Sequence, residues 1–127
     1  MSYPLFAAGV LAVLATIGHF FAGYKMYIRP IIGSNADVIP KNVVLCLFHY
    51  MSVYLILTAI ILLAFSFGYS LIFDSIHDVT LVIGISYAGF ALAQLAVALT
   101  SSVKSGPLKM FQWIFWLLIA LLSLVAA

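Results

Sequence analysis

Charged residues are scarce in this chain of 127 residues, and glutamate is absent. Lys, Arg, Asp and Glu together make up 6% of the sequence, and the three aspartates lie outside the long apolar segments. A soluble protein needs a far more charged surface, so this composition excludes an ordinary soluble domain. The lack of a carboxylate in any apolar segment also argues against carboxylate-coupled antiport, in which such a group carries the proton.

Cysteine occurs once, at Cys46, so the chain forms no internal disulfide. The sequence also has no Gly-rich phosphate loop, no nucleophile elbow, no metalloprotease helix motif and no pair of acidic residues. These patterns are the usual signatures of hydrolases and transferases. We therefore expect a protein that is not an enzyme.

Apolar sequence, by contrast, is abundant: 67% of the residues are hydrophobic, and the mean hydropathy is +1.31. A membrane-spanning helix needs about 20 apolar residues. Four runs have about this length, and we predict spans at residues 4–24, 43–67, 79–100 and 108–126. The runs are apolar on all sides, unlike the alternating strands of a membrane β-barrel. The predicted fold is all-α, with residues 1–127 forming a single domain, an antiparallel bundle of four transmembrane helices.

The basic residues predict the orientation of this bundle. All of them lie in or beside the first and third predicted connections, whereas the second connection contains Asp74, His77 and Asp78. The basic residues are Lys25, Arg29, Lys41, Lys104 and Lys109. By the positive-inside rule, they anchor the cytoplasmic side and leave both termini on the non-cytoplasmic side. Attraction to anionic lipid accounts for the net charge of +2, so we expect the lipid bilayer and no nucleic acid as a partner.

Small residues predict which helix faces meet, because they allow two backbones to approach closely. The first span has a stripe at intervals of three and four residues: Ala8, Ala12, Ala15, His19 and Ala22. The third span has a comparable stripe: Gly84, Ala88, Ala91, Gln94 and Ala98. In the second span we predict an inward face with Cys46 one turn before it: His49, Ser52, Ile56 and Ala59.

Rare polar side chains occur at similar depths in different spans. His19, His49 and Gln94 are about five or six residues from the cation-rich ends of their spans, and Gln112 is about four residues from it. At a rise of 1.5 Å per residue, all four lie roughly 6 to 9 Å below one surface. Polar groups in hydrocarbon need partners, so we predict a His/Gln layer with Ser52, Gln94 and Gln112 in support. Nearby aromatic residues are expected to form an interfacial belt: Tyr24, Tyr50, Trp113 and Trp116.

Three functions agree with such a layer. In the first, which the sequence favours, its hydrogen bonds fix helix register in a non-enzymatic accessory or self-associating subunit, and Ala93 and Ala96 suit a homodimer or a larger complex. In the second, His19 and His49 ligate haem, or join Cys46 around a transition metal, in a redox protein. In the third, the layer lines a path for a small solute or a lipid.

One sequence pattern resembles that of a known group of proteins. His19, Gly23, Arg29 and Pro30 form the pattern H-x3-G-x5-R-P, which is followed by His49-x2-Ser52. This resembles an uncharacterised family of small bacterial four-helix integral membrane proteins. The resemblance implies the bacterial inner membrane as the location and makes His19 and His49 the distinctive positions. It implies no activity.

Overall fold

A computed structural model describes residues 1–127, and all of its regular structure is helical. The helices are α1 (Tyr3–Gly18), η1 (His19–Ile28), α2 (Arg29–Ile32), α3 (Val38–Ser66), α4 (Ile76–Thr100), α5 (Gly106–Lys109) and α6 (Trp113–Ala126). Three continuous helices are long and apolar enough to cross a membrane, and α6 is a shorter apolar helix of 14 residues. The prediction of an all-α fold is therefore confirmed. Three of the four predicted spans lie in helices that are long enough to cross a membrane.

The first helix is longer than the sequence predicted. α1, η1 and α2 form one continuous helix of 30 residues, Tyr3–Ile32, although the predicted span ended at residue 24. η1 is a π-helix of ten residues. The return to α-helical hydrogen bonding begins at Arg29. Pro30 follows directly and has no amide proton, so it donates no backbone hydrogen bond to the preceding turn. The connection to α3 is thus reduced to residues 33–37.

The fourth predicted span, residues 108–126, is interrupted near its start. α5 ends at Lys109, the next residue, Met110, has φ −110° and ψ 55°, and α6 begins only at Trp113. The side-chain amide of Gln94 donates a hydrogen bond of 3.2 Å to the Met110 carbonyl oxygen. A carbonyl group freed by a break needs such a partner in an apolar environment. The amide of Gln94 thus stabilises a break that hydropathy alone does not reveal.

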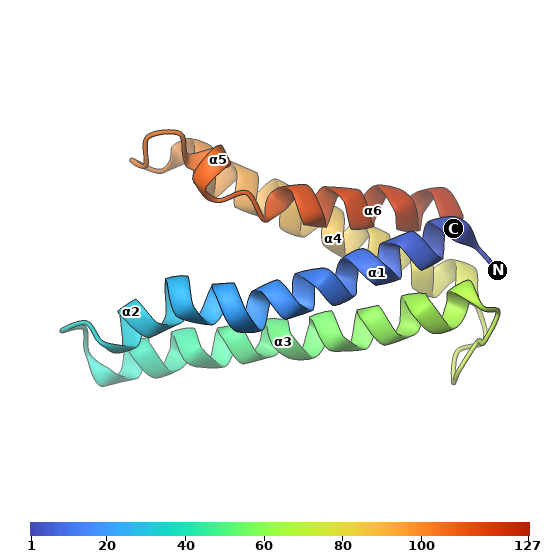
Figure 1. The fold of residues 1–127 in the computed structure, drawn as a ribbon, viewed down its shortest axis with the longest axis horizontal. Helices are drawn as coiled ribbons and strands as arrows, with labels where there is room; N and C mark the ends of the chain where they lie inside the picture. Colours follow the sequence, from blue (N-terminus) through green and yellow to red (C-terminus); the bar gives the residue numbers. More distant parts are fainter.

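The helices form two antiparallel pairs (Figure 1). The N-terminal hairpin comprises α1, η1 and α2 packed against α3, and the C-terminal hairpin comprises α4, α5 and α6. A glycine allows close packing in each: a Cβ added to Gly9 would lie 2.7 Å from Leu63 Cδ2, and one added to Gly84 would lie 2.8 Å from Leu124 Cδ2. Both hairpins are therefore tightly packed internally.

The two hairpins meet at the end that carries both termini and diverge towards the end where α2 and α5 lie (Figure 1). Most of the contact between them is made by α1 and α6. The core fills the converging part, and its most buried members are Ala8, Ala12, Leu55, Leu62, Tyr87 and Ile119. All five basic residues lie on elements or connections at the diverging end.

Candidate functional site

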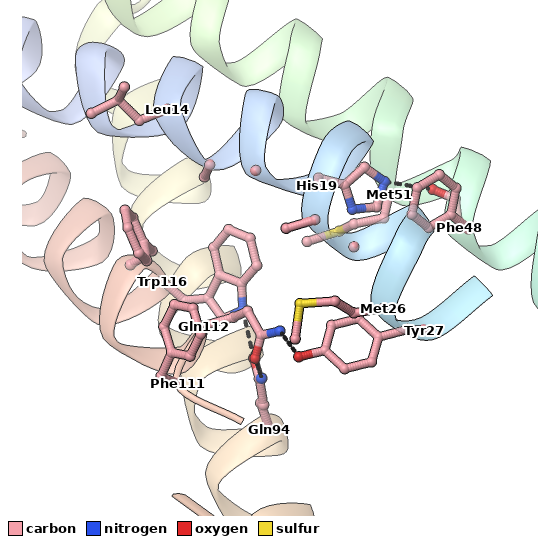
Figure 2. Close-up of a pocket in the computed structure, with 15 residues that line it drawn as sticks. Leu14, His19, Met26, Tyr27, Phe48, Met51, Gln94, Phe111, Gln112 and Trp116 are labelled. Carbon is pink, nitrogen blue, oxygen red and sulfur yellow. Dashed lines mark hydrogen bonds between the residues drawn. The ribbon is translucent and has the colours of Figure 1, made fainter. Parts of the chain in front are cut away.

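A cleft of about 520 Å³ lies between the hairpins where they diverge (Figure 2). Fifteen residues line this cleft, and ten of them are hydrophobic. They belong to α1, η1, α3, α4, α6 and the segment just before α6. None of the lining residues is charged. A concave, mostly apolar site of this size with a few polar groups is typical of small-molecule binding sites.

Small residues make room for the cleft on the side of the N-terminal hairpin. Ala15, Gly18, Ala22 and Gly23 all line it. A Cβ added to Gly18 would have no other atom within 4 Å, so the space in front of this glycine is open. The stripe of small residues predicted on the first span therefore has two environments. Its first part is buried in the core, and its second part faces the cleft.

His19, the first residue of η1, lies on the wall of the cleft and is bonded to α3 (Figure 2). Its Nε2 atom is 2.9 Å from Ser52 Oγ and 3.1 Å from the Phe48 carbonyl oxygen. The imidazole ring stacks on the Phe48 ring, with 3.9 Å between centroids and 14° between planes. These contacts hold the ring in one orientation and join the two helices of the N-terminal hairpin.

The opposite wall carries a chain of hydrogen bonds (Figure 2). Trp116 Nε1 donates to Gln94 Oε1 at 2.8 Å, Gln94 Nε2 donates to Gln112 Oε1 at 2.7 Å, and Gln112 Nε2 donates to Tyr27 Oη at 2.9 Å. Each amide group in the chain uses its oxygen as an acceptor and its nitrogen as a donor, so the amide orientations are mutually consistent. Because Tyr27 belongs to η1, its bond with Gln112 crosses the cleft and joins the two hairpins.

His49 and Cys46 do not take part in this site. Both are exposed, and neither lines the cleft. The inward face of α3 consists of Phe48, Ser52, Leu55, Ala59 and Leu62, so the predicted inward positions of Ser52 and Ala59 are confirmed. The predicted inward positions of His49 and Ile56 were therefore wrong, because a helix that is apolar on all sides has no polar face to reveal its rotation in the bundle.

The structure also does not gather the residues of the predicted metal centre. No group of three or more His, Cys, Asp or Glu side chains lies close enough together to hold a metal ion. The cleft contains one imidazole, that of His19, so it offers no second histidine for bis-histidine haem ligation. The remaining histidine, His77, lies near the termini, where its Nδ1 atom is 2.6 Å from the carbonyl oxygen of Ala127.

Two members of the hydrogen-bond chain were not assigned to the polar layer from the sequence. Tyr27 was expected in a connection, and Trp116 was expected in the interfacial belt, yet both line the cleft and both belong to the hydrogen-bond chain. Trp116 is four residues after Gln112, which is one helical turn, and this spacing was the available signal. Tyr27 gave no comparable signal because its position depends on the unpredicted continuation of the first helix.

Comparisons with family models, with curated proteins and with solved structures find no match to this chain. The resemblance inferred from the histidine pattern is therefore not supported by any match, and the proposal below depends on the geometry of the cleft.

Proposed function

We propose that this chain is a non-enzymatic integral membrane protein that binds an apolar molecule from the bilayer in the cleft between its hairpins. The observation that carries the proposal is the cleft itself, with its volume of about 520 Å³ and its uncharged, mostly apolar lining. A polar soluble ligand would lose its hydrogen bonds to water in this lining, whereas the apolar chains of a lipid have no such bonds to lose. A lipid-like molecule therefore fits the site best.

The proposed topology has four membrane crossings with both termini on the non-cytoplasmic side. It is supported by the position of the two termini at one end of the molecule and of the basic residues at the other (Figure 1). The positive-inside rule then directs the diverging end towards the cytoplasm. α6 is short for a crossing, but α5 and the segment before α6 extend the same pass towards the basic surface. We further propose the bacterial inner membrane as the location.

Ligand access is proposed to be lateral, from the membrane. In this topology the cleft lies between two hairpins in the cytoplasmic half of the bilayer, where lipid chains surround the protein. No part of the chain needs to open to water for a lipid to enter. The internal packing of each hairpin would stay intact during binding, because the hairpins themselves form the two walls.

Two glycines provide a matched test of this function. Gly18 lines the cleft, whereas Gly89 is exposed on α4, and a Cβ added to either would meet no other atom within 4 Å. Gly18→Leu is expected to fill part of the cleft, while Gly89→Leu changes the helix in the same way outside it. The protein would be purified in a mild detergent, and native mass spectrometry would measure the small molecules that remain bound.

We expect about one apolar molecule per chain in the unmodified protein and in Gly89→Leu, and a severalfold lower occupancy in Gly18→Leu. Equal occupancy in the two variants, or no bound molecule in the unmodified protein, would contradict the proposed function. Thermal unfolding of both variants in the same detergent serves as the control for folding.

A second proposal, self-association, is supported by an exposed face of small residues on α4. Gly89, Ala93 and Ala96 share this face and are all exposed, a pattern that allows another helix to approach closely. The same two variants separate the proposals. Cross-linking in membranes should detect a dimer that is weakened in Gly89→Leu and retained in Gly18→Leu; the opposite pattern would contradict this second proposal.

A further inference from the structure

The contacts of His19 determine which of its ring nitrogens carries the proton. Nε2 lies 3.1 Å from the Phe48 carbonyl oxygen, which can only accept a hydrogen bond. The Ser52 hydroxyl donates to the same carbonyl oxygen at 3.0 Å, so Ser52 Oγ is left to accept from Nε2, 2.9 Å away. Both contacts require a proton on Nε2. In the neutral imidazole, Nδ1 is therefore an acceptor.

This acceptor has no partner within the protein. Nδ1 of His19 makes no hydrogen bond, whereas Nε2 makes two contacts with α3. One turn further along η1, Gly23 has no side chain to cover it, and a Cβ placed there would lie 3.9 Å from Nδ1. Both residues line the cleft. A polar atom in an apolar cleft gains free energy from a hydrogen-bond partner, so a ligand that donates to Nδ1 is favoured over one that does not.

The lining of the cleft also restricts the charge of the ligand. No Lys, Arg, Asp or Glu side chain faces the cleft, and its other polar groups are neutral amide, phenol and indole groups. A phosphate or carboxylate head group would be removed from water without a counter-ion, at a large cost in free energy. The site therefore disfavours phospholipids and ionised fatty acids.

We infer that the cleft binds an uncharged lipid through a hydroxyl head group that donates a hydrogen bond to Nδ1 of His19. This inference rests on the proposed function, since it names the class of molecule that occupies the same cleft. The apolar body of the lipid contacts the hydrophobic lining, on which Leu14, Met51 and Phe115 lie. The hydroxyl group can belong to a diacylglycerol or to a prenyl alcohol, and the experiment distinguishes these two sources.

Trp116 provides a built-in probe for the test. The chain has two tryptophans, and only Trp116 lines the cleft, where its Nε1 atom is bonded to Gln94. In a Trp113→Phe background, its fluorescence reports on the cleft alone. The protein would be placed in phosphatidylcholine nanodiscs with a diacylglycerol that carries brominated chains, because bromine quenches nearby tryptophan. Parallel samples would contain the methyl ether of that diacylglycerol or the corresponding phosphatidic acid.

We expect saturable quenching by the diacylglycerol at a mole fraction roughly tenfold lower than by its methyl ether, because the ether carries a methyl group in place of the proton that the alcohol donates. The phosphatidic acid should quench only in proportion to its bulk concentration. Unlabelled geranylgeraniol would be added as a competitor. If it relieves the quenching at a lower mole fraction than unlabelled diacylglycerol does, the preferred source is a prenyl alcohol; the reverse order assigns a diacylglycerol.

His19→Phe tests the role of the acceptor, because phenylalanine can keep the stacking on Phe48 but has no Nδ1. This variant should bind the diacylglycerol and its ether equally. His49→Phe makes the same change outside the cleft and should keep the roughly tenfold preference. The comparison of alcohol with ether in the protein that retains His19 does not depend on folding of either histidine variant.

The outcomes separate this inference from the proposed function. Saturable but equal quenching by the alcohol and the ether, in the protein with His19, would overturn the hydroxyl recognition and leave an apolar binding site. A preference for the phosphatidic acid would overturn the uncharged head group. The absence of saturable quenching by every lipid would overturn both the inference and the proposed function.

Discussion

The two ends of the interface between the hairpins are built in different ways. In the converging part, fully buried side chains such as Leu55, Tyr87 and Ile119 pack together, and the Tyr87 hydroxyl is 2.8 Å from Thr58 Oγ1. In the diverging part, a cleft separates the hairpins, and the Tyr27–Gln112 hydrogen bond is the one side-chain hydrogen bond that crosses it. We therefore expect stability to come mainly from the first region, whereas the second contains the cleft for which we propose a binding function.

The difference can be traced to neighbouring turns of the same helices. On α3, Leu55 is buried and Met51, one turn earlier, lines the cleft. On α1, Ala12 is buried, whereas Ala15 and Gly18 line the cleft. Similar apolar residues are therefore buried in the core on one turn and line the cleft on the next, because the distance between the hairpins increases along their length (Figure 1).

The largest effect is expected from a pair of truncations on α3. Leu55→Ala removes a side chain with 0% exposure and should lower the free energy of unfolding by about 3 kcal/mol, through lost contacts and a new cavity. Met51→Ala enlarges a cleft that already exists and should cost about 1 kcal/mol or less. Both values would be measured by denaturant-induced unfolding in the same micelles. Equal costs would show that the two regions are packed alike.

A smaller effect is expected when the hydroxyl group of Tyr87 is removed. Thr58 keeps its hydrogen bond of 2.8 Å to the Tyr54 carbonyl oxygen, so Tyr87→Phe leaves no new unpaired group on α3. The expected cost is about 0.6 kcal/mol, a typical value for a hydrogen bond between membrane helices. Tyr69→Phe, an exposed tyrosine in the connection before α4, is the control and should have no effect in the same assay. A cost above about 2 kcal/mol would mean that this hydrogen bond, rather than packing, joins the hairpins.

The smallest effect on stability is expected for Tyr27→Phe, which removes the hydrogen bond across the cleft. The cost should be a few tenths of a kcal/mol, because both groups lie near the surface. The distance between the hairpins should nevertheless vary more in Tyr27→Phe than in the unmodified protein. Spin labels on Cys46, which is the single cysteine, and on Val103→Cys would report the distance distribution between α3 and the connection after α4.

We expect a broader distribution in Tyr27→Phe than in the unmodified protein. Tyr24→Phe is the matched control, because Tyr24 is also an exposed tyrosine of η1 and its hydroxyl group makes no hydrogen bond to the protein. Identical distributions in all three proteins would show that the Tyr27–Gln112 bond does not hold the cleft at its width.

Part of this architecture could be predicted from the sequence. The long apolar runs predicted the helices of an all-α protein, and small residues such as Ala12, Gly84 and Ala91 correctly predicted which faces of α1 and α4 are buried. Such residues are informative because their size limits how closely two helices approach. The positions of the helix ends were predicted less accurately. The first helix continues past Lys25, whose long side chain can reach a polar surface from within a helix.

The candidate site was harder to predict. The depths of His19 and His49 along their helices were similar, but depth does not define the direction in which a side chain points. His19 faces Ser52, whereas His49 is exposed. The pairing of Gln94 with Gln112 also depends on the break at Met110, which places the start of α6 beside α4.

Composition was sufficient to predict an all-helical protein with helices long and apolar enough to cross a membrane, because the length of an apolar run can be read directly from the sequence. The rotation of each helix, the break before α6 and the divergence of the hairpins were decided only by the tertiary structure. They depend on which side chains from distant segments meet, as Tyr27 meets Gln112. Hydropathy does not encode these contacts when a helix is apolar on every side.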